Sequence, residues 1–185
     1  RGQPLIQFAA FFATALALSI VPAVSEALAK GQHKVVAVRS ELALRITFLF
    51  GLPASIGLAV IAGPANILLY RNDEGSAVIA ILAMTTVFTT LGVTSSGILQ
   101  GLGRVVLPAR NLLIGVGVKL VLNLLLTGPF GITGAAVATV AAYAVSTGLN
   151  MLSLSKLITL KMNWSNQLKP LIAAVVMAVV VYGLV

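Results

Sequence analysis

Four long stretches of this chain carry no charged side chain, and this feature constrains the fold more than any other. A helix of about 20 apolar residues crosses a hydrocarbon core of about 30 Å, and every one of these stretches exceeds that length. The last is long enough for two crossings, with Thr127–Gly131 (TGPFG) as the turn between them. The charge-free stretches are Gly2–Ser25, Ile46–Tyr70, Gly75–Gly103 and Leu120–Ser155.

The composition requires lipid rather than water around the folded chain. Residues are 59% apolar and 9% charged, with a mean hydropathy of +1.08, which leaves too little polar material to cover a soluble globule. The stretches are apolar nearly all round, as membrane-spanning helices are, and lack the short alternating segments of an outer-membrane barrel. We therefore predict an all-α, polytopic transmembrane bundle of about six spans. The predicted helices cover residues 4–28, 42–70, 76–100, 106–127, 132–157 and 168–185.

The basic residues lie in every second gap between the apolar stretches. Nine of the twelve Lys and Arg residues fall in three gaps, and short loops rich in these residues stay cytoplasmic. We therefore predict a multi-pass membrane protein whose basic loops lie in the cytoplasm and whose first helix enters from outside. Because the net charge of +8 is spread over short loops, we expect anionic membrane lipids, and not nucleic acid, as its partner. The nine bases are Lys30, Lys34, Arg39, Arg45, Arg104, Arg110, Lys156, Lys161 and Lys169.

The inventory of reactive side chains disfavours catalysis. The chain has no cysteine and one histidine, His33, in a predicted surface loop over residues 30–40 that follows the membrane interface. No Asp or Glu occurs inside a span, so this segment offers no metal centre, thiol nucleophile or buried proton relay. We predict that the chain is not an enzyme and uses no cofactor.

Lys119 is the cation predicted to lie deepest in the membrane. It follows Arg110 by nine residues, roughly 13 Å along a helix, and an ammonium group exposed to lipid there costs about 2.5–3.5 kcal/mol. Asn123 lies one turn further along the same face. One interpretation is a contact for an anionic substrate group such as a phosphate. The alternative is that the lysine reaches the interface or pairs inside the protein.

Two prolines lie within predicted helices, Pro22 in the first and Pro53 in the second. A proline removes one backbone hydrogen bond and bends the helix that contains it. The two residues are therefore either hinges of a moving transporter or static bends that shape the packing.

Regularly spaced threonines and small residues predict contacts between helices. The threonine face either lines a wet groove or bonds to its own carbonyl groups and packs against a neighbour. The small residues predict close packing of two helices, and Asn150 predicts a polar contact between helices. The spaced residues are Thr86, Thr90 and Thr94 in one segment and Gly134, Ala138 and Ala142 in another.

Three stretches, in this order, resemble a known family of membrane transporters. They are similar to the carboxy-terminal lobe of bacterial polysaccharide exporters of the stage V sporulation protein B type. These exporters belong to the multidrug/oligosaccharidyl-lipid/polysaccharide flippase superfamily, which also includes the lipid II flippase MurJ. The resemblance covers most of the chain and implies a location in the bacterial cytoplasmic membrane. The stretches are SIVPAVSEALAKGQ followed by GLPASIGL, then LQGLGRVVLPARNLLIGVGVKLVLNLLL, then GITGAAVATVAAY.

The resemblance implies both a function and a larger protein. Members have two lobes of six helices, which move lipid-linked saccharides outward by alternating access, and the present segments correspond to helices eight to twelve and the start of a thirteenth. Residues 1–167 then belong to the carboxy-terminal lobe, residues 168–185 begin a further, truncated helix, and an amino-terminal lobe belongs to the same polypeptide. The resemblance makes Lys119 with Asn123, and secondly Arg45 near the cytoplasmic mouth, candidates for holding a polyprenyl-pyrophosphate-linked saccharide.

Two other functions stay open at this point. One is a cation-coupled multidrug exporter of the same superfamily, which acidic and aromatic cavity residues would favour. The other is a membrane scaffold that assembles cell-envelope enzymes without transporting anything.

Overall fold

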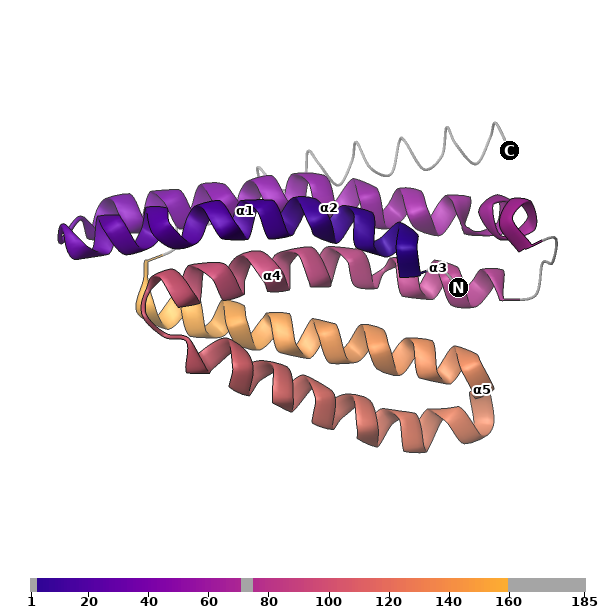
Figure 1. The fold of residues 1–185 in the computed structure, drawn as a ribbon. Helices are drawn as coiled ribbons and strands as arrows, with labels where there is room; N and C mark the ends of the chain where they lie inside the picture. Colours follow the sequence, from indigo (N-terminus) through magenta and orange to yellow (C-terminus); the bar gives the residue numbers. More distant parts are fainter. Residues whose placement is uncertain (1–2, 71–74, 160–185) are drawn as a thin grey trace.

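The computed structural model describes residues 3–70 and 75–159, and each regular element in those ranges is an α-helix (Figure 1). The predicted all-α class is therefore confirmed. The predicted helix at residues 168–185 lies outside the described residues. The helices are α1 (Gln3–Ala29), α2 (His33–Tyr70), α3 (Ser76–Ala83), α4 (Thr85–Gly101) and α5 (Val106–Leu157).

Helix α5 is a hairpin of two antiparallel arms. Gly131 has φ 56° and ψ −135°, a conformation that glycine adopts without the steric cost of a side chain. Pro129 lies two residues before it. The chain reverses here, so the first arm (106–130) runs beside the second arm (132–157), as Figure 1 shows. The turn predicted at Thr127–Gly131 is confirmed.

Helix α2 begins earlier than predicted. The turn after α1 comprises only Lys30–Gln32, with Gly31 at φ 69°, and the predicted loop over residues 30–40 is wrong from His33 onward. The reason is that Val36 and Ser40 continue the buried face of α2 and are 1% and 0% exposed. Burial of this face stabilises the extra turns as helix.

The predicted helix over 76–100 is interrupted at Met84. The Met84 N–H donates to the carbonyl of Ile81, three residues back, at 3.1 Å. The Thr85 hydroxyl donates to the carbonyl of Leu82, also three residues back. The Met84 backbone bond to the third preceding residue tightens the local turn, so α3 and α4 are separate helices that together cover the predicted span.

Three helical segments are long and apolar enough to cross a membrane: His33–Gly63, Ser76–Gly101 and Val106–Leu157. A shorter apolar segment covers Thr14–Ala29. The α5 segment of 52 residues would measure about 78 Å if straight, more than twice the hydrocarbon thickness. The reversal at Gly131 divides this length into two arms, each longer than the about 20 residues that one crossing needs.

The basic residues gather at one end of the bundle. The α1–α2 turn, the α4–α5 turn and the last turn of α5 all lie at this end, on the left in Figure 1; we call it the basic end. Of the Lys and Arg residues in the described ranges, Arg45 and Lys119 lie furthest from it along their helices, twelve residues after His33 and thirteen after Val106. The others are Lys30, Lys34, Arg39, Arg104, Arg110 and Lys156.

Helix α4 lies at the centre of the bundle and packs against α1, α2 and α5. A Cβ atom on Gly97 would come within 3.1 Å of Ala17, so the small residue allows α4 and α1 to approach closely. The Thr94 hydroxyl lies 2.8 Å from that of Thr47 in α2. The apolar core lies between these helices toward the basic end: Ile20, Val24, Ala27, Val36, Ala43, Leu44, Ile98, Leu99 and Leu154.

The predicted patterns of threonines and small residues pack as expected. Thr86, Thr90 and Thr94 are buried in α4, which confirms packing rather than a wet face. Gly134 is buried against the carbonyl of Leu126 across the α5 hairpin. The close approach of two helices predicted from the small residues is therefore confirmed for the two arms.

Candidate substrate site: a groove on α4 and a half-buried lysine

A groove of about 550 Å³ lies on α4, with α1 forming one wall and both arms of α5 the other. Its walls are mainly aliphatic, whereas hydroxyl and amide groups are distributed along its floor and the α5 side. Such a mixture of apolar surface and a few polar groups is typical of ligand sites and of buried contacts between membrane helices. The polar lining residues are Thr14, Thr89, Ser96, Gln100, Tyr143, Ser146, Thr147 and Asn150.

Close contact between helices sets the depth of the groove. A Cβ atom on Gly92 would lie 2.9 Å from the hydroxyl oxygen of Thr147. That hydroxyl donates a 2.8 Å hydrogen bond to the carbonyl of Phe88 in α4. The glycine therefore lets the second arm of α5 approach α4 closely enough for this bond to form.

A buried amide network lies behind the groove. The side chain of Asn111 donates to Asn150 at 2.8 Å and to Ser153 at 3.4 Å. Asn150 in turn donates to Ser96 of α4 at 3.1 Å. The predicted interhelical contact of Asn150 is confirmed, whereas sequence reasoning did not identify Asn111 as its partner. An asparagine in an apolar helix needs a polar side chain on a neighbouring helix as its hydrogen-bond partner. This rule could have identified Asn111 from the sequence.

Lys119 lies half-buried on the first arm of α5. It is one turn from Gly115, whose missing Cβ would meet the carbonyl of Ala142 on the second arm at 2.8 Å. Residues four apart share a helix face, so Lys119 lies on the side of the first arm that faces the second. The described residues provide no ion-pair partner for its ammonium group.

Asn123 lies one turn beyond Lys119 and is also half-buried. Its side-chain carbonyl oxygen is buried and accepts no hydrogen bond from the described residues. A buried acceptor without a donor costs about 1–3 kcal/mol. The two residues therefore form one polar spot on one face of the first arm, and neither lines the groove on α4.

Arg45 does not join this spot. Its guanidinium lies 3.7 Å from the carboxylate of Glu41, one turn back on α2, and α2 and α5 form no extensive interface. Of the three predicted substrate contacts, the structure therefore brings together Lys119 and Asn123 and leaves Arg45 apart.

The predicted hinges are both inside helices. Pro22 lies within α1, which continues to Ala29, and Pro53 lies within α2. Pro22 is exposed and Pro53 half-buried. The moving or static character of these positions stays a prediction.

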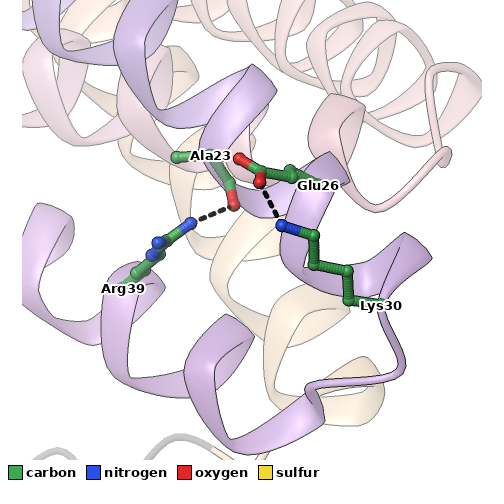
Figure 2. A network of polar contacts seen from close by, with 4 residues as sticks. All are labelled: Ala23, Glu26, Lys30 and Arg39. Atoms are coloured by element: carbon green, nitrogen blue, oxygen red, sulfur yellow. Dashed lines mark hydrogen bonds and ion pairs between the residues drawn. The ribbon is translucent and has the colours of Figure 1, made fainter.

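A polar contact joins α1 and α2 near their shared turn. Figure 2 shows the Arg39 guanidinium donating to the carbonyl of Ala23 at 2.7 Å, beside the ion pair between Lys30 and Glu26. The hydrogen bond from Lys30 and its positive charge hold the pKa of the Glu26 carboxyl below its usual value, and Arg39 contributes in the same direction. The sequence analysis did not identify this contact, which depends on the short turn before α2.

The sequence of this chain is similar to those of three known membrane proteins. The chain is 40% identical to an uncharacterized membrane protein, YabM, of Bacillus subtilis over 154 residues, which cover 83% of this chain and 29% of YabM. It is 30% identical to the probable low-salt glycan biosynthesis flippase Agl15 of Haloferax volcanii, with 93% of this chain and 37% of Agl15 covered. It is 26% identical to the lipid II flippase MurJ of B. subtilis, with 78% and 27% covered.

The chain thus spans about a third of the length of these relatives. Its fold matches the solved structure of a lipid II flippase MurJ in an inward closed conformation with a TM-score of 0.74 and 18% identity, covering 98% of this chain and 41% of that one. The family model described as lipid II flippase MurJ matches residues 5–185. Because this match covers nearly the whole chain, the chain belongs to the MurJ family of multi-pass membrane flippases.

Proposed function

We propose that this chain is the carboxy-terminal lobe of a transporter that moves a lipid-linked saccharide across the bacterial cytoplasmic membrane by alternating access. The family match over residues 5–185 carries this proposal. A relative named as a glycan biosynthesis flippase supports a saccharide as the cargo. The transporter's role is translocation without covalent chemistry, so the protein is not an enzyme.

In this proposal, Lys119 is the cationic contact for the pyrophosphate of the polyprenyl carrier, and the Asn123 amide assists it. Three observations support the role: Lys119 is half-buried, lies roughly 13 Å beyond Arg110 along the first arm, and has no ion-pair partner in the described ranges. A buried cation without a counter-ion is costly. A phosphate group would supply the missing negative charge when the transporter opens toward the substrate.

Arg45 has a secondary role in the proposal. It lies nearer the basic end, where its exposed guanidinium and loose pairing with Glu41 leave it able to attract an anion. Pro22 and Pro53 are proposed as the positions at which α1 and α2 change direction during the cycle. Residues 1–167 form the lobe, and residues 168–185 begin a further helix.

The groove on α4 is proposed as the seat of another transmembrane helix of the complete transporter. By the resemblance, α1 corresponds to helix eight of the family. A lobe of helices seven to twelve then includes helix seven, which is not part of this chain. Its mainly aliphatic walls can pack against a helix, and the hydroxyl and amide groups of its lining can satisfy polar side chains of that helix. The amino-terminal lobe of the same polypeptide is the proposed partner of this one.

A substitution series at Lys119 in the complete transporter tests the proposed function. Lys119→Ala is expected to abolish flipping of a fluorescent polyprenyl-pyrophosphate saccharide in proteoliposomes, and Lys119→Arg to retain part of it because the charge remains. Lys156→Ala is the matched control, since it removes an exposed lysine at the basic end. Normal flipping by Lys119→Ala would remove Lys119 from the site, and absence of flipping by the unmodified protein would remove the proposed function.

The two rival functions give different results in the same assay. A cation-coupled multidrug exporter would move amphiphilic dyes and not the saccharide lipid. A scaffold would retain its partner proteins in pull-down experiments without moving either compound.

A further inference from the structure

A second cavity lies at the basic end, between the first turns of α2 and the residues that end α5. Its volume is about 550 Å³, and we call it the basic-end cleft. The α2 side contributes His33, Lys34, Val38 and Glu41, and the α5 side contributes Leu157 and Thr159. The two sides are held together by the apolar core, in which Val36 and Leu154 are fully buried.

The charge balance of the cleft favours an anion. Lys34 is exposed and has no ion-pair partner among the described residues, so its ammonium group is available to a ligand. The Glu41 carboxylate is the one acidic group of the lining, and the Arg45 guanidinium 3.7 Å away offsets its charge. His33 and Thr159 add hydrogen-bond donors beside Lys34. Together these groups can bind a phosphate.

The apolar part of the cleft has a defined direction. Val38 is one turn further along α2 than Lys34, about 6 Å closer to the middle of the bundle, and it is 65% exposed. Leu157 on the opposite side is 40% exposed. The lining is therefore polar at His33 and Lys34 and apolar at Val38 and Leu157, while the Glu41 carboxylate, which pairs with Arg45, lies about one turn beyond Val38. A phospholipid in a leaflet places its phosphate and the start of its acyl chains in the order of the first two groups.

We propose that the basic-end cleft binds an anionic phospholipid of the cytoplasmic leaflet as a resident lipid. Its phosphate contacts Lys34 and His33, with the Thr159 hydroxyl as a further donor, and its acyl chains lie against Val38 and Leu157. Basic pockets between membrane helices on the cytoplasmic side are suited to such headgroups. The proposal depends on the membrane location and on the basic end being cytoplasmic, and it is independent of the transported substrate.

The test measures lipid selectivity beside the cleft. These residues contain no cysteine, so Leu42→Cys, in a complete transporter whose cysteines outside this chain are replaced by serine, takes a single fluorescent label one turn beyond Val38 on an exposed position of α2. Quenching by brominated phosphatidylglycerol is expected to show an apparent affinity about fivefold higher than quenching by brominated phosphatidylcholine. Lys34→Gln is expected to remove most of this preference, and Lys34→Arg to restore it.

Lys30→Gln is the matched control, because Lys30 lies in the neighbouring turn, pairs with Glu26 and does not line the cleft. It is expected to leave the preference unchanged. Equal quenching by the two lipids would overturn the proposal, as would an equal loss in Lys30→Gln, which would indicate a diffuse surface potential. Displacement of phosphatidylglycerol by equimolar polyprenyl pyrophosphate or by inorganic phosphate would also overturn it. None of these outcomes depends on flipping, so the two proposals fail separately.

Discussion

Asn111 on the first arm of α5 donates a 2.8 Å hydrogen bond to Asn150 on the second arm. Both side chains are nearly fully buried, at 1% and 2% exposure. Asn150 also donates to Ser96 of α4. Two amides thus connect three helical segments, while the side-chain oxygen of Asn111 is buried and accepts no hydrogen bond from the described residues.

Replacing Asn111 with alanine is expected to destabilise the bundle by about 1–2 kcal/mol, because Asn150 loses its donor while remaining buried. Unfolding in mixed detergent micelles measures the change. Leu113→Ala is the control, since Leu113 lies on the same arm and is 71% exposed. A loss for Asn111→Ala no larger than that for Leu113→Ala would show that the amide network contributes nothing to stability.

Alanine substitutions at two glycines of the first arm of α5 are expected to change stability differently, so that one serves as the control for the other. A Cβ atom on Gly115 would lie 2.8 Å from the carbonyl oxygen of Ala142 and 3.0 Å from the Ser146 Cβ, whereas a Cβ atom on Gly117 meets nothing within 4 Å. Gly115→Ala is therefore expected to destabilise the hairpin by about 1–3 kcal/mol through overpacking.

Gly117→Ala is expected to leave stability unchanged or raise it by up to about 1 kcal/mol, since alanine is the better helix former. The same unfolding experiment measures both variants. Equal effects of the two substitutions would mean that the two arms of α5 can move apart to accommodate the added methyl group at residue 115 without a loss of stability. This result would contradict the close packing of Gly115 on Ala142.

The sequence predicted the parts of the fold that depend on local patterns of residues. Charge-free stretches located the helices, Gly131 located the reversal in α5, and the small residues at Gly134 and its neighbours predicted close packing. The boundary at His33 was missed because the first turns of α2 are amphipathic and resemble an interfacial loop. Their burial depends on Val36 packing into a core contributed by other helices, which no local pattern contains.

The candidate site could be predicted only in part. Lys119 and Asn123 share a face because they are one turn apart, and that relation is local. The separation of Arg45 from them, by contrast, follows from the small contact between α2 and α5, each of which packs mainly on α4. The contact of Arg39 with Ala23 likewise depends on the path of the turn between α1 and α2. Such relations arise from tertiary packing and are invisible in residue spacing.

The Glu26 carboxyl supplies a prediction about pH. It lies just beyond the charge-free part of α1, and the hydrogen bond and charge of Lys30 lower its pKa below its usual value. Because the folded-state pKa is depressed, the pair's contribution to stability is present above the unfolded pKa and is lost as pH falls through the folded value. Both groups are exposed, so the contribution is small.

Carboxyl ¹³C chemical shifts of Glu26 across the acidic range measure this effect. Lys30→Gln is expected to return the Glu26 pKa toward its usual value. Arg39→Gln is expected to raise it less, because Arg39 acts on Glu26 through charge alone. A larger shift in Arg39→Gln than in Lys30→Gln would reverse the order of these two contributions.

The groove on α4 gives the last prediction, which separates a helix seat from a water-filled cavity. If another helix of the complete transporter occupies the groove, a cysteine at Val93 or Ser146 in its lining is covered by protein. We expect a membrane-impermeant maleimide added from either side to leave Val93→Cys and Ser146→Cys unlabelled. Arg104→Cys, in the exposed α4–α5 turn, is the positive control and should react from the side that the basic end faces. Labelling of both groove positions would instead identify the groove as an aqueous cavity, and its hydroxyl and amide groups would then be available to the saccharide.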